Sequence, residues 1–205
     1  MSGVITSVLV DPSSQTNWDQ GNRAKLLQGD VLLQTQSHSM WGGAVTAQMY
    51  LPLGRSQVWQ QVTDYPRWVL YFPDLVQSEI LSRGDGIAEG ATRKYKRLYQ
   101  VASKAFFLFT AQVEIYLKVF ETAQTTWQQI QFQLEKGSFA DFTANLKLQD
   151  LQTGTLLTYS VQATPTIPVP TQFIQQAMRF DLPTNMEKMR QVLCGQPVPR
   201  SGLRW

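Results

Sequence analysis

Cysteine and histidine are scarce in this chain of 205 residues, which contains one of each, Cys194 and His38. A single cysteine excludes an internal disulfide and a thiolate metal cluster, and it is typical of a reducing compartment. His38 lies in a polar stretch, and no Ser-His-Asp grouping can be read from the spacing around it. We therefore expect no catalytic group, no metal ion and no cofactor.

Charged residues are also few, at 16% of the sequence against the ~25% that is usual in globular domains. Neutral glutamine fills much of the gap, as in "WQQIQFQLE". The formal net charge of +3 is mildly basic, far from the dense positive surface that nucleic acid usually requires. We expect no nucleic-acid partner.

Long hydrophobic runs are absent, since no stretch approaches the ~20 apolar residues of a transmembrane helix. The apolar run at residues 4–10 is too short for a signal peptide and has no basic segment before it. The sequence thus predicts a cytoplasmic protein, or at most one that is peripheral to a membrane.

One domain accounts for most of the chain, because neither a repeat nor a charged linker divides it. Residues 1–23 are rich in small polar side chains and predict a flexible arm. Residues 24–195 form the expected single domain, and residues 196–205 form the expected flexible tail.

Hydrophobic residues recur with period two over much of the chain, which predicts an antiparallel sheet with one covered face. The segments are residues 29–37, a first possible strand, followed by 44–51, 75–82, 92–101, 106–121, 126–135, 139–151 and 155–165. Gly84-Asp85-Gly86 predicts a hairpin turn between two of them.

Helical patterns occur at two places. Residues 54–64 predict a short helix, and one or two further turns follow at residues 67–72, where Pro66 and Pro73 interrupt the chain. Near the C-terminus, apolar residues at three- and four-residue steps predict a long helix over residues 171–193, kinked or divided at Pro183. This helix is the candidate to cover the apolar face of the sheet.

The order of these elements, with "VWQQVTDYPRWVLYFPDLVQSEIL", "GSFADFTANLKL", "GTLLTYSVQATP" and the C-terminal helix, resembles the START-like (SRPBCC) superfamily. Within it, the polyketide cyclase/dehydrase and coenzyme-Q-binding-like subgroup is most similar. The resemblance implies an α+β helix-grip fold. A curved antiparallel sheet of about six to seven strands would surround the long C-terminal helix, with two short helices after the first strands.

The resemblance also implies an apolar ligand cavity between the sheet and the last helix. From the sheet, the residues expected to face it are Tyr95, Tyr99, Phe107, Phe109, Val113, Phe132, Phe142 and Tyr159. The helix would add Met178, Leu182, Met186 and Met189, and Arg97 is a candidate partner for a polar ligand group. Each of these residues can equally be ordinary core.

Two functions remain open. We favour a binder or carrier of a hydrophobic small molecule such as a lipid or an isoprenoid quinone. The alternative is a cyclase/aromatase-type enzyme in which Tyr95, Tyr159 or Arg97 would orient a carbonyl. The basic run at residues 93–97 either meets a ligand, touches an anionic membrane or forms a solvated strand edge.

Overall fold

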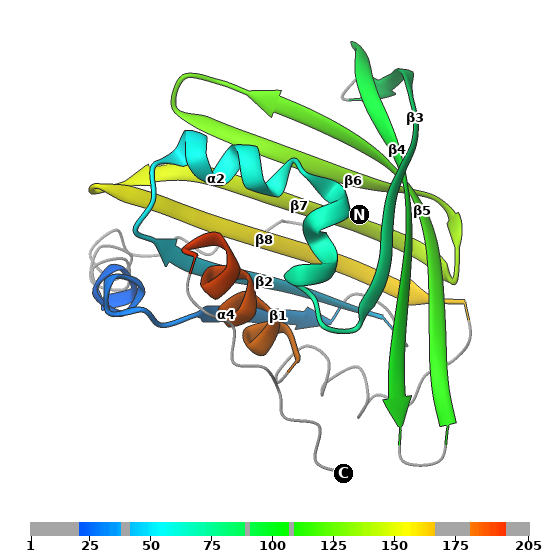
Figure 1. Ribbon diagram of the computed structural model, residues 1–205, viewed down its shortest axis with the longest axis horizontal. Helices are drawn as coiled ribbons and strands as arrows, with labels where there is room; N and C mark the ends of the chain where they lie inside the picture. The colour runs from blue at the N-terminus through cyan, green and yellow to red at the C-terminus, as the bar shows by residue number, and fades with distance from the viewer. Residues whose placement is uncertain (1–20, 38–41, 89–90, 107–108, 167–180, 196–205) are drawn as a thin grey trace, which may run out of the picture.

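A curved antiparallel sheet forms the framework of the protein (Figure 1). The computed structural model describes residues 21–37, 42–88, 91–106, 109–166 and 181–195. The strands are β1 (Leu32–Ser37), β2 (Gly43–Leu51), β3 (Leu75–Ala88), β4 (Ala91–Phe106), β5 (Phe109–Ala123), β6 (Trp127–Gly137), β7 (Phe139–Leu151) and β8 (Gly154–Pro165). Their spatial order is β1-β2-β8-β7-β6-β5-β4-β3. Strands β1 and β3 therefore form the two edges.

Alternation of side chains divides the sheet into an inner and an outer face. In β2 every second residue is buried, and Ala47, Met49 and Leu51 are fully covered. The same alternation buries Leu98 of β4 and Leu117 of β5 in the core. Since successive strand residues point to opposite faces, the residues between them face outward.

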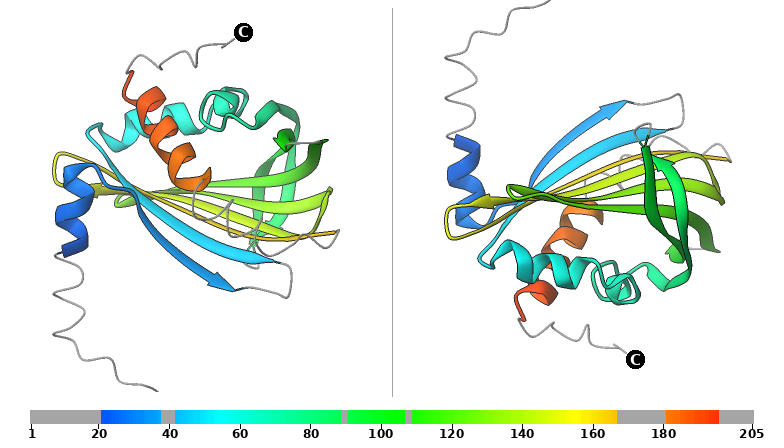
Figure 2. Two further views of the ribbon diagram at one scale, coloured as in Figure 1. Left: turned by 90° about the horizontal axis from the view of Figure 1, so that it is seen from below. Right: turned by 90° about the horizontal axis from the view of Figure 1, so that it is seen from above.

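Among the described residues, the helices that follow β2 lie on the inner face (Figure 2). They are α2 (Arg55–Val62), the 3₁₀ helix η1 (Tyr65–Leu70) and α4 (Leu182–Leu193). Each contributes buried side chains to the core: Val58 and Val62 from α2, Tyr65 and Trp68 from η1, and Leu182, Met186, Met189 and Leu193 from α4. The helix-grip fold is thereby confirmed, with α4 held inside the curve of the sheet.

Three local expectations need correction. The sheet has eight strands among the described residues, because the first possible strand pairs with β2 as the edge strand β1. Phe106 ends β4 and does not begin the next strand. Residues 21–28 form a helix that the sequence patterns do not indicate.

The Gly84-Asp85-Gly86 segment is not a hairpin turn. It lies inside β3, where Gly84 pairs with Tyr95 and Gly86 with Arg93. The ring of Tyr95 lies across both glycines, so that a Cβ atom at either position would stand 3.0 Å from it. Glycine here makes room for an aromatic ring on the neighbouring strand.

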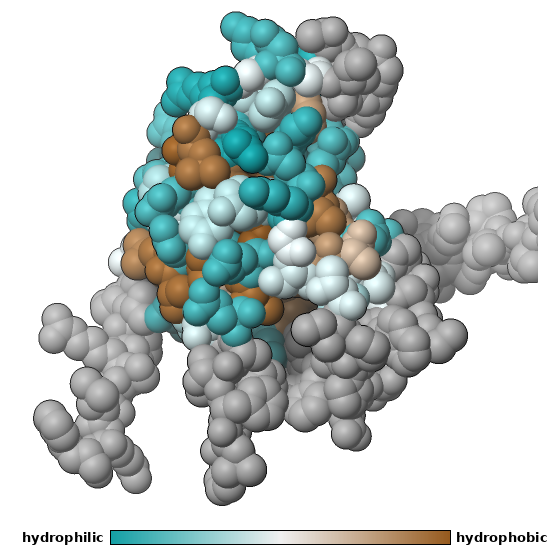
Figure 3. Space-filling model, turned by 90° about the vertical axis from the view of Figure 1, so that its right-hand side faces the viewer, coloured by the Kyte–Doolittle hydropathy of each residue, from teal (hydrophilic) through white to brown (hydrophobic). Residues whose placement is uncertain are grey.

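Two bulges mark the edge strand β3, between Leu75 and Gln77 and between Ile80 and Ser82. The extra residues, Val76 and Leu81, are exposed hydrophobic side chains. Figure 3 shows that hydrophobic and hydrophilic residues are interspersed over the side of the molecule it presents. No helix among the described residues has the length and apolar character needed to span a bilayer.

Candidate functional site

A cluster of aromatic rings joins η1 to the inner face of the sheet. The ring of Trp68 stacks on Phe72 at a centroid distance of 5.6 Å and meets Phe132 of β6 edge to face at 5.1 Å. Phe72 and Tyr159 of β8 lie 6.0 Å apart. The prolines that shorten the helices thus allow η1 to turn its rings onto the strands.

Beside these rings lies a pocket of about 220 Å³ between η1, β3, β4, β8 and α4. Three aromatic side chains form part of its wall, and the complete lining is Trp68, Phe72, Asp74, Leu75, Gln100, Ala102, Tyr159 and Asn185. Apolar walls with a small number of polar groups are typical of small-molecule sites.

Tyr159 is a buried tyrosine in the wall of this pocket. Its side chain is 8% exposed, and within the described part of the chain nothing forms a hydrogen bond with the hydroxyl. Burial raises the pKa of Tyr159 above its usual value, so the hydroxyl stays protonated and can donate. A polar group of a guest is a suitable acceptor.

Gln100 is the second buried polar residue of the wall. Its amide nitrogen donates to Ser78 Oγ at 3.0 Å, and Ser78 donates in turn to the carbonyl oxygen of Tyr65 at 2.7 Å. This chain fixes the orientation of the Gln100 side chain, since amide nitrogen and carbonyl oxygen are not interchangeable here. Asn185 of α4 adds a further amide at the same pocket.

Several residues expected at the cavity do lie on the inner side of the molecule. Of these, Tyr159 lines the pocket; Val113, Phe132 and Phe142 belong to the inner face, and Leu182, Met186 and Met189 are buried on α4. Phe107 and Met178 lie outside the described residues, and Phe109 is placed only by the backbone of β5. Their contact with a ligand stays a prediction.

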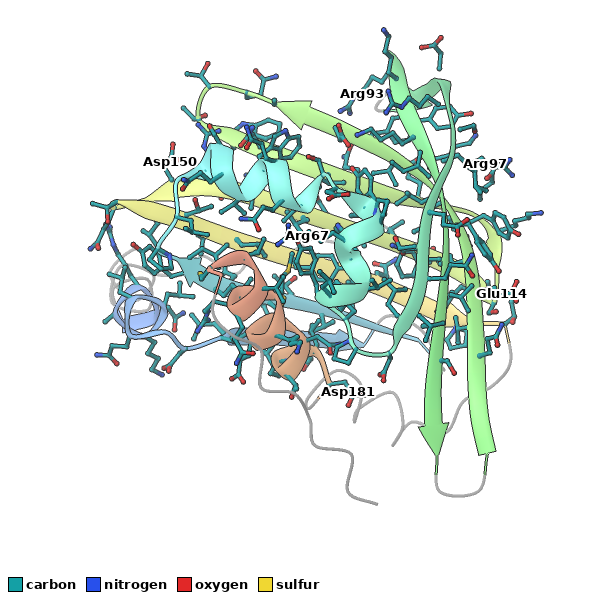
Figure 4. All side chains as sticks on the ribbon, viewed as in Figure 1. Arg67, Arg93, Arg97, Glu114, Asp150 and Asp181 are labelled. Carbon is teal, nitrogen blue, oxygen red and sulfur yellow. The ribbon has the colours of Figure 1, made fainter. Side chains whose placement is uncertain are left out.

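For Tyr95, Arg97 and Tyr99 the expected inward orientation is wrong. Leu98 is fully buried on the inner face, so these odd-numbered neighbours of β4 point to the outer face. There the rings of Tyr99 and Tyr116 pack with their centroids 4.8 Å apart, and Arg97, which is labelled in Figure 4, forms an ion pair with Glu135. The outer face of this strand carries the tyrosines, whereas its inner face carries Lys96, Leu98, Gln100 and Ala102.

The other seven lining residues were not predicted to be near a ligand: Trp68, Phe72, Asp74, Leu75, Gln100, Ala102 and Asn185. Alternation from Leu98 would have placed Gln100 and Ala102 on the same face. No comparable signal exists for Asn185, because a polar residue on an amphipathic helix usually faces solvent.

Of the remaining candidates for chemistry, Cys194 does not line this pocket. His38 lies outside the described residues, and Cys194 is half-buried with a pKa raised mainly by that burial. No group of three or more potential metal-binding side chains occurs among the described residues.

Known structures share this architecture at low sequence identity. The START superfamily protein from Mycobacterium smegmatis aligns with a TM-score of 0.52 and 16% identity over 74% of this chain and 94% of its own. The STAR-related lipid transfer protein from Xanthomonas axonopodis aligns with a TM-score of 0.59 and 12% identity. The alignment covers 78% of this chain and 98% of that protein. Human STARD10 aligns with a TM-score of 0.61 and 11% identity, over 92% of this chain and 82% of its own.

At the sequence level, no protein of curated function matches this chain. Residues 51–190 match the family described as polyketide cyclase / dehydrase and lipid transport. That span includes η1, the sheet from β3 to β8 and most of α4, and it therefore contains every residue that lines the pocket. The chain belongs to the polyketide cyclase / dehydrase and lipid transport family.

Proposed function

We propose that this protein binds a hydrophobic small molecule, such as a lipid or an isoprenoid quinone, on the inner face of its sheet. The observation that carries the proposal is the pocket walled by Trp68, Phe72 and Tyr159 beneath α4. Membership of a family described by lipid transport supports a hydrophobic ligand in general. A structure of the same fold, from Xanthomonas axonopodis, is named a STAR-related lipid transfer protein.

The dimensions of the pocket favour a slender guest. Its volume of about 220 Å³ is below the ~300–1,000 Å³ of most drug-sized ligand sites. A single chain or ring fits such a space better than a fused-ring system. Each CH₂ group that leaves water contributes ~0.8 kcal/mol, so a short apolar segment needs few polar contacts.

Tyr159 and Asn185 are the proposed polar anchors. The hydroxyl of Tyr159 is protonated and has no described partner, and the Asn185 amide reaches the pocket from α4. A carbonyl or hydroxyl on the guest could accept hydrogen bonds from the Tyr159 hydroxyl, which burial makes costly to leave without a partner, and from the half-buried Asn185 amide.

Native mass spectrometry of the protein purified from its own host, followed by organic extraction, tests this function. Replacing Ala102 with Phe fills the pocket, and we expect the co-purified guest to be lost. Ser103→Phe is the matched control, because this neighbour on β4 points to the other face of the sheet. Retention of the guest by a folded Ala102→Phe protein would contradict the assigned pocket.

The enzyme alternative now depends on Tyr159. Of the three residues proposed to orient a carbonyl, Tyr95 and Arg97 lie on the outer face, and only Tyr159 lines the pocket. A cyclase-type reaction would convert the guest during incubation, and Tyr159→Phe would slow that conversion without preventing binding. An unchanged guest after prolonged incubation supports the binder.

A further inference from the structure

The 3₁₀ helix η1 separates two compartments on the inner face of the sheet. Along β4, Leu98 is fully buried, whereas Gln100 and Ala102 open into the apolar pocket on one side. On the other side, Lys94 and Lys96 open into a second pocket of about 510 Å³. This second pocket, which we call the charged pocket, is lined by inner-face residues together with Gly84 and Tyr95, which alternate to the outer face. The inner-face residues are Arg83, Asp85, Lys94, Lys96, Val119 and Glu121.

The two pockets differ in chemistry. The apolar pocket has three aromatic rings in its wall, whereas the charged pocket has three cationic side chains, Arg83, Lys94 and Lys96, and two acidic ones, Asp85 and Glu121. A hydrophobic guest is therefore suited to the first pocket alone. The charged pocket requires a separate explanation.

Glu121 is already occupied by two partners. Lys96 Nζ lies 2.6 Å from Glu121 Oε1, and the Tyr65 hydroxyl donates to the same oxygen at 2.5 Å. The ammonium of Lys96 also lies 5.1 Å from the centroid of the Tyr65 ring. This arrangement anchors Lys96 and Glu121 to η1, and it neutralises the acidic group nearest to the helix.

Arg83 is placed directly opposite Lys96 in the β3–β4 register. Two like charges opposite each other on one face of a sheet are unfavourable. Asp85 stands opposite Lys94, yet among the described residues neither Arg83 nor Lys94 forms an ion pair. Lys96 and Glu121 neutralise each other. The remaining charged residues of the pocket are the cationic Arg83 and Lys94 and the acidic Asp85, so the pocket carries a net positive charge.

We propose that the charged pocket binds a phosphate group. The Arg83 guanidinium can form a two-pronged contact with a tetrahedral oxyanion, and Lys94 adds a flexible ammonium. An anion held between them would also offset the repulsion between Arg83 and Lys96. This inference does not depend on the proposed function, because η1 lies between the two pockets.

The phosphate can belong to a soluble ion or metabolite, or to the headgroup of a phospholipid at a membrane surface. Two probes distinguish these sources. Inorganic phosphate, titrated against the protein and followed by calorimetry and by amide shifts of β3 and β4, reports on a soluble anion. Vesicles of phosphatidylcholine with and without phosphatidic acid, tested by co-sedimentation, report on a headgroup.

The test variant is Arg83→Gln combined with Lys94→Gln. The matched control is Lys136→Gln combined with Lys147→Gln, which removes the same net charge from residues that lie over the rings of Tyr116 and Trp127. We expect the first pair to weaken binding by at least about tenfold, as for the loss of charge-assisted hydrogen bonds. The control pair should change it less than about twofold, the small effect of distant, screened charges.

Either probe can support the proposal. Binding of phosphate, or of vesicles only when they contain phosphatidic acid, supports it if that binding depends on Arg83 and Lys94. Binding of neither probe would overturn it. Equal weakening in the two double variants would also overturn it, because net charge alone would then explain the effect.

Discussion

The rings of Trp68 and Phe132 meet edge to face with their centroids 5.1 Å apart, which attaches η1 to the middle of the sheet. The Trp68 indole also donates a buried hydrogen bond of 2.8 Å from Nε1 to the carbonyl oxygen of Val62. One side chain thereby links η1 to both α2 and β6. The shape of the apolar pocket depends on this residue, because Trp68 is also part of its wall.

Replacing Trp68 with Ala should lower the free energy of unfolding by ~3–5 kcal/mol, as is typical when a large buried side chain is removed. Trp68→Phe keeps a ring but leaves the Val62 carbonyl without its donor, at a cost of ~1–3 kcal/mol. Urea denaturation followed by circular dichroism measures both values.

Trp127 offers a control for this pair of variants. It is half-buried on the outer face, where the Lys147 ammonium lies 5.6 Å from its ring. Trp127→Ala should cost about 1 kcal/mol, in the range of ordinary partly exposed substitutions. Comparable losses for Trp68→Ala and Trp127→Ala would show that the ring cluster does not anchor η1.

Patterns in the sequence were sufficient for the fold and for most of the core. Clean alternation in β6, with Ile130 and Phe132 against Gln129 and Gln131, assigns both the strand and its inner face. The β4 strand was ambiguous, because its inner face has lysines and a glutamine while its outer face has tyrosines. Hydrophobicity alone therefore assigned this strand to the wrong face.

Tertiary context explains the misassigned turn in the same region. Gly84 and Gly86 look like a hairpin turn in isolation, but they accommodate the ring of Tyr95 from the adjacent strand. This contact is between residues about ten positions apart, and a local pattern does not contain it. The sequence analysis likewise predicted an apolar cavity between the sheet and the last helix. The position of Asn185 in its wall follows only from the way α4 packs on the sheet.

Gly137 ends β6 with a φ of 146°, a region that other residues rarely adopt. A Cβ atom there would also stand 2.3 Å from the carbonyl oxygen of Glu114. We expect Gly137→Ala to lower the free energy of unfolding by at least ~1–3 kcal/mol, the usual cost of backbone strain. Denaturant titration measures the change.

Gly54 is the control for this glycine, since it has a φ of −62° and an added Cβ would meet only Gln57 Oε1 at 3.7 Å. Gly54→Ala should change the stability by about 1 kcal/mol or less, as for an N-cap position. Equal free energies of unfolding for Gly137→Ala and Gly54→Ala would contradict the prediction. The backbone between β6 and β7 would then have to relax around the new side chain.

Alkaline pH should destabilise the protein through its buried tyrosines. Burial is the main cause that raises the pKa values of Tyr65, Tyr71 and Tyr159. The pKa of Tyr71 is raised to about 12. Unfolded tyrosine ionises near pH 10. Their contribution to stability is therefore complete below about pH 10 and is lost as the pH rises through the folded-state values.

Thermal melting between neutral pH and about pH 12 measures this loss, with tyrosinate absorbance as an independent signal. The melting temperature should fall from about pH 10 upward, and the absorbance should rise together with unfolding. The decline should be shallower in Tyr159→Phe, which has one ionisable group fewer. A complete rise of tyrosinate absorbance in the folded protein would contradict the assigned burial.

The outer face should be dispensable for ligand uptake. Arg97 forms an ion pair with Glu135 there, and its guanidinium lies 5.8 Å from the Tyr116 ring, so Arg97→Ala should cost ~1 kcal/mol or less of stability. Because Leu98 separates this face from the apolar pocket, Arg97→Ala and Tyr99→Ala should bind the extracted guest with unchanged affinity.

Asn185→Ala, within the pocket, should weaken binding by about threefold to tenfold through loss of one hydrogen bond. Fluorescence titration with the guest distinguishes these cases, and a larger effect of Arg97→Ala than of Asn185→Ala would place the ligand on the outer face of the sheet.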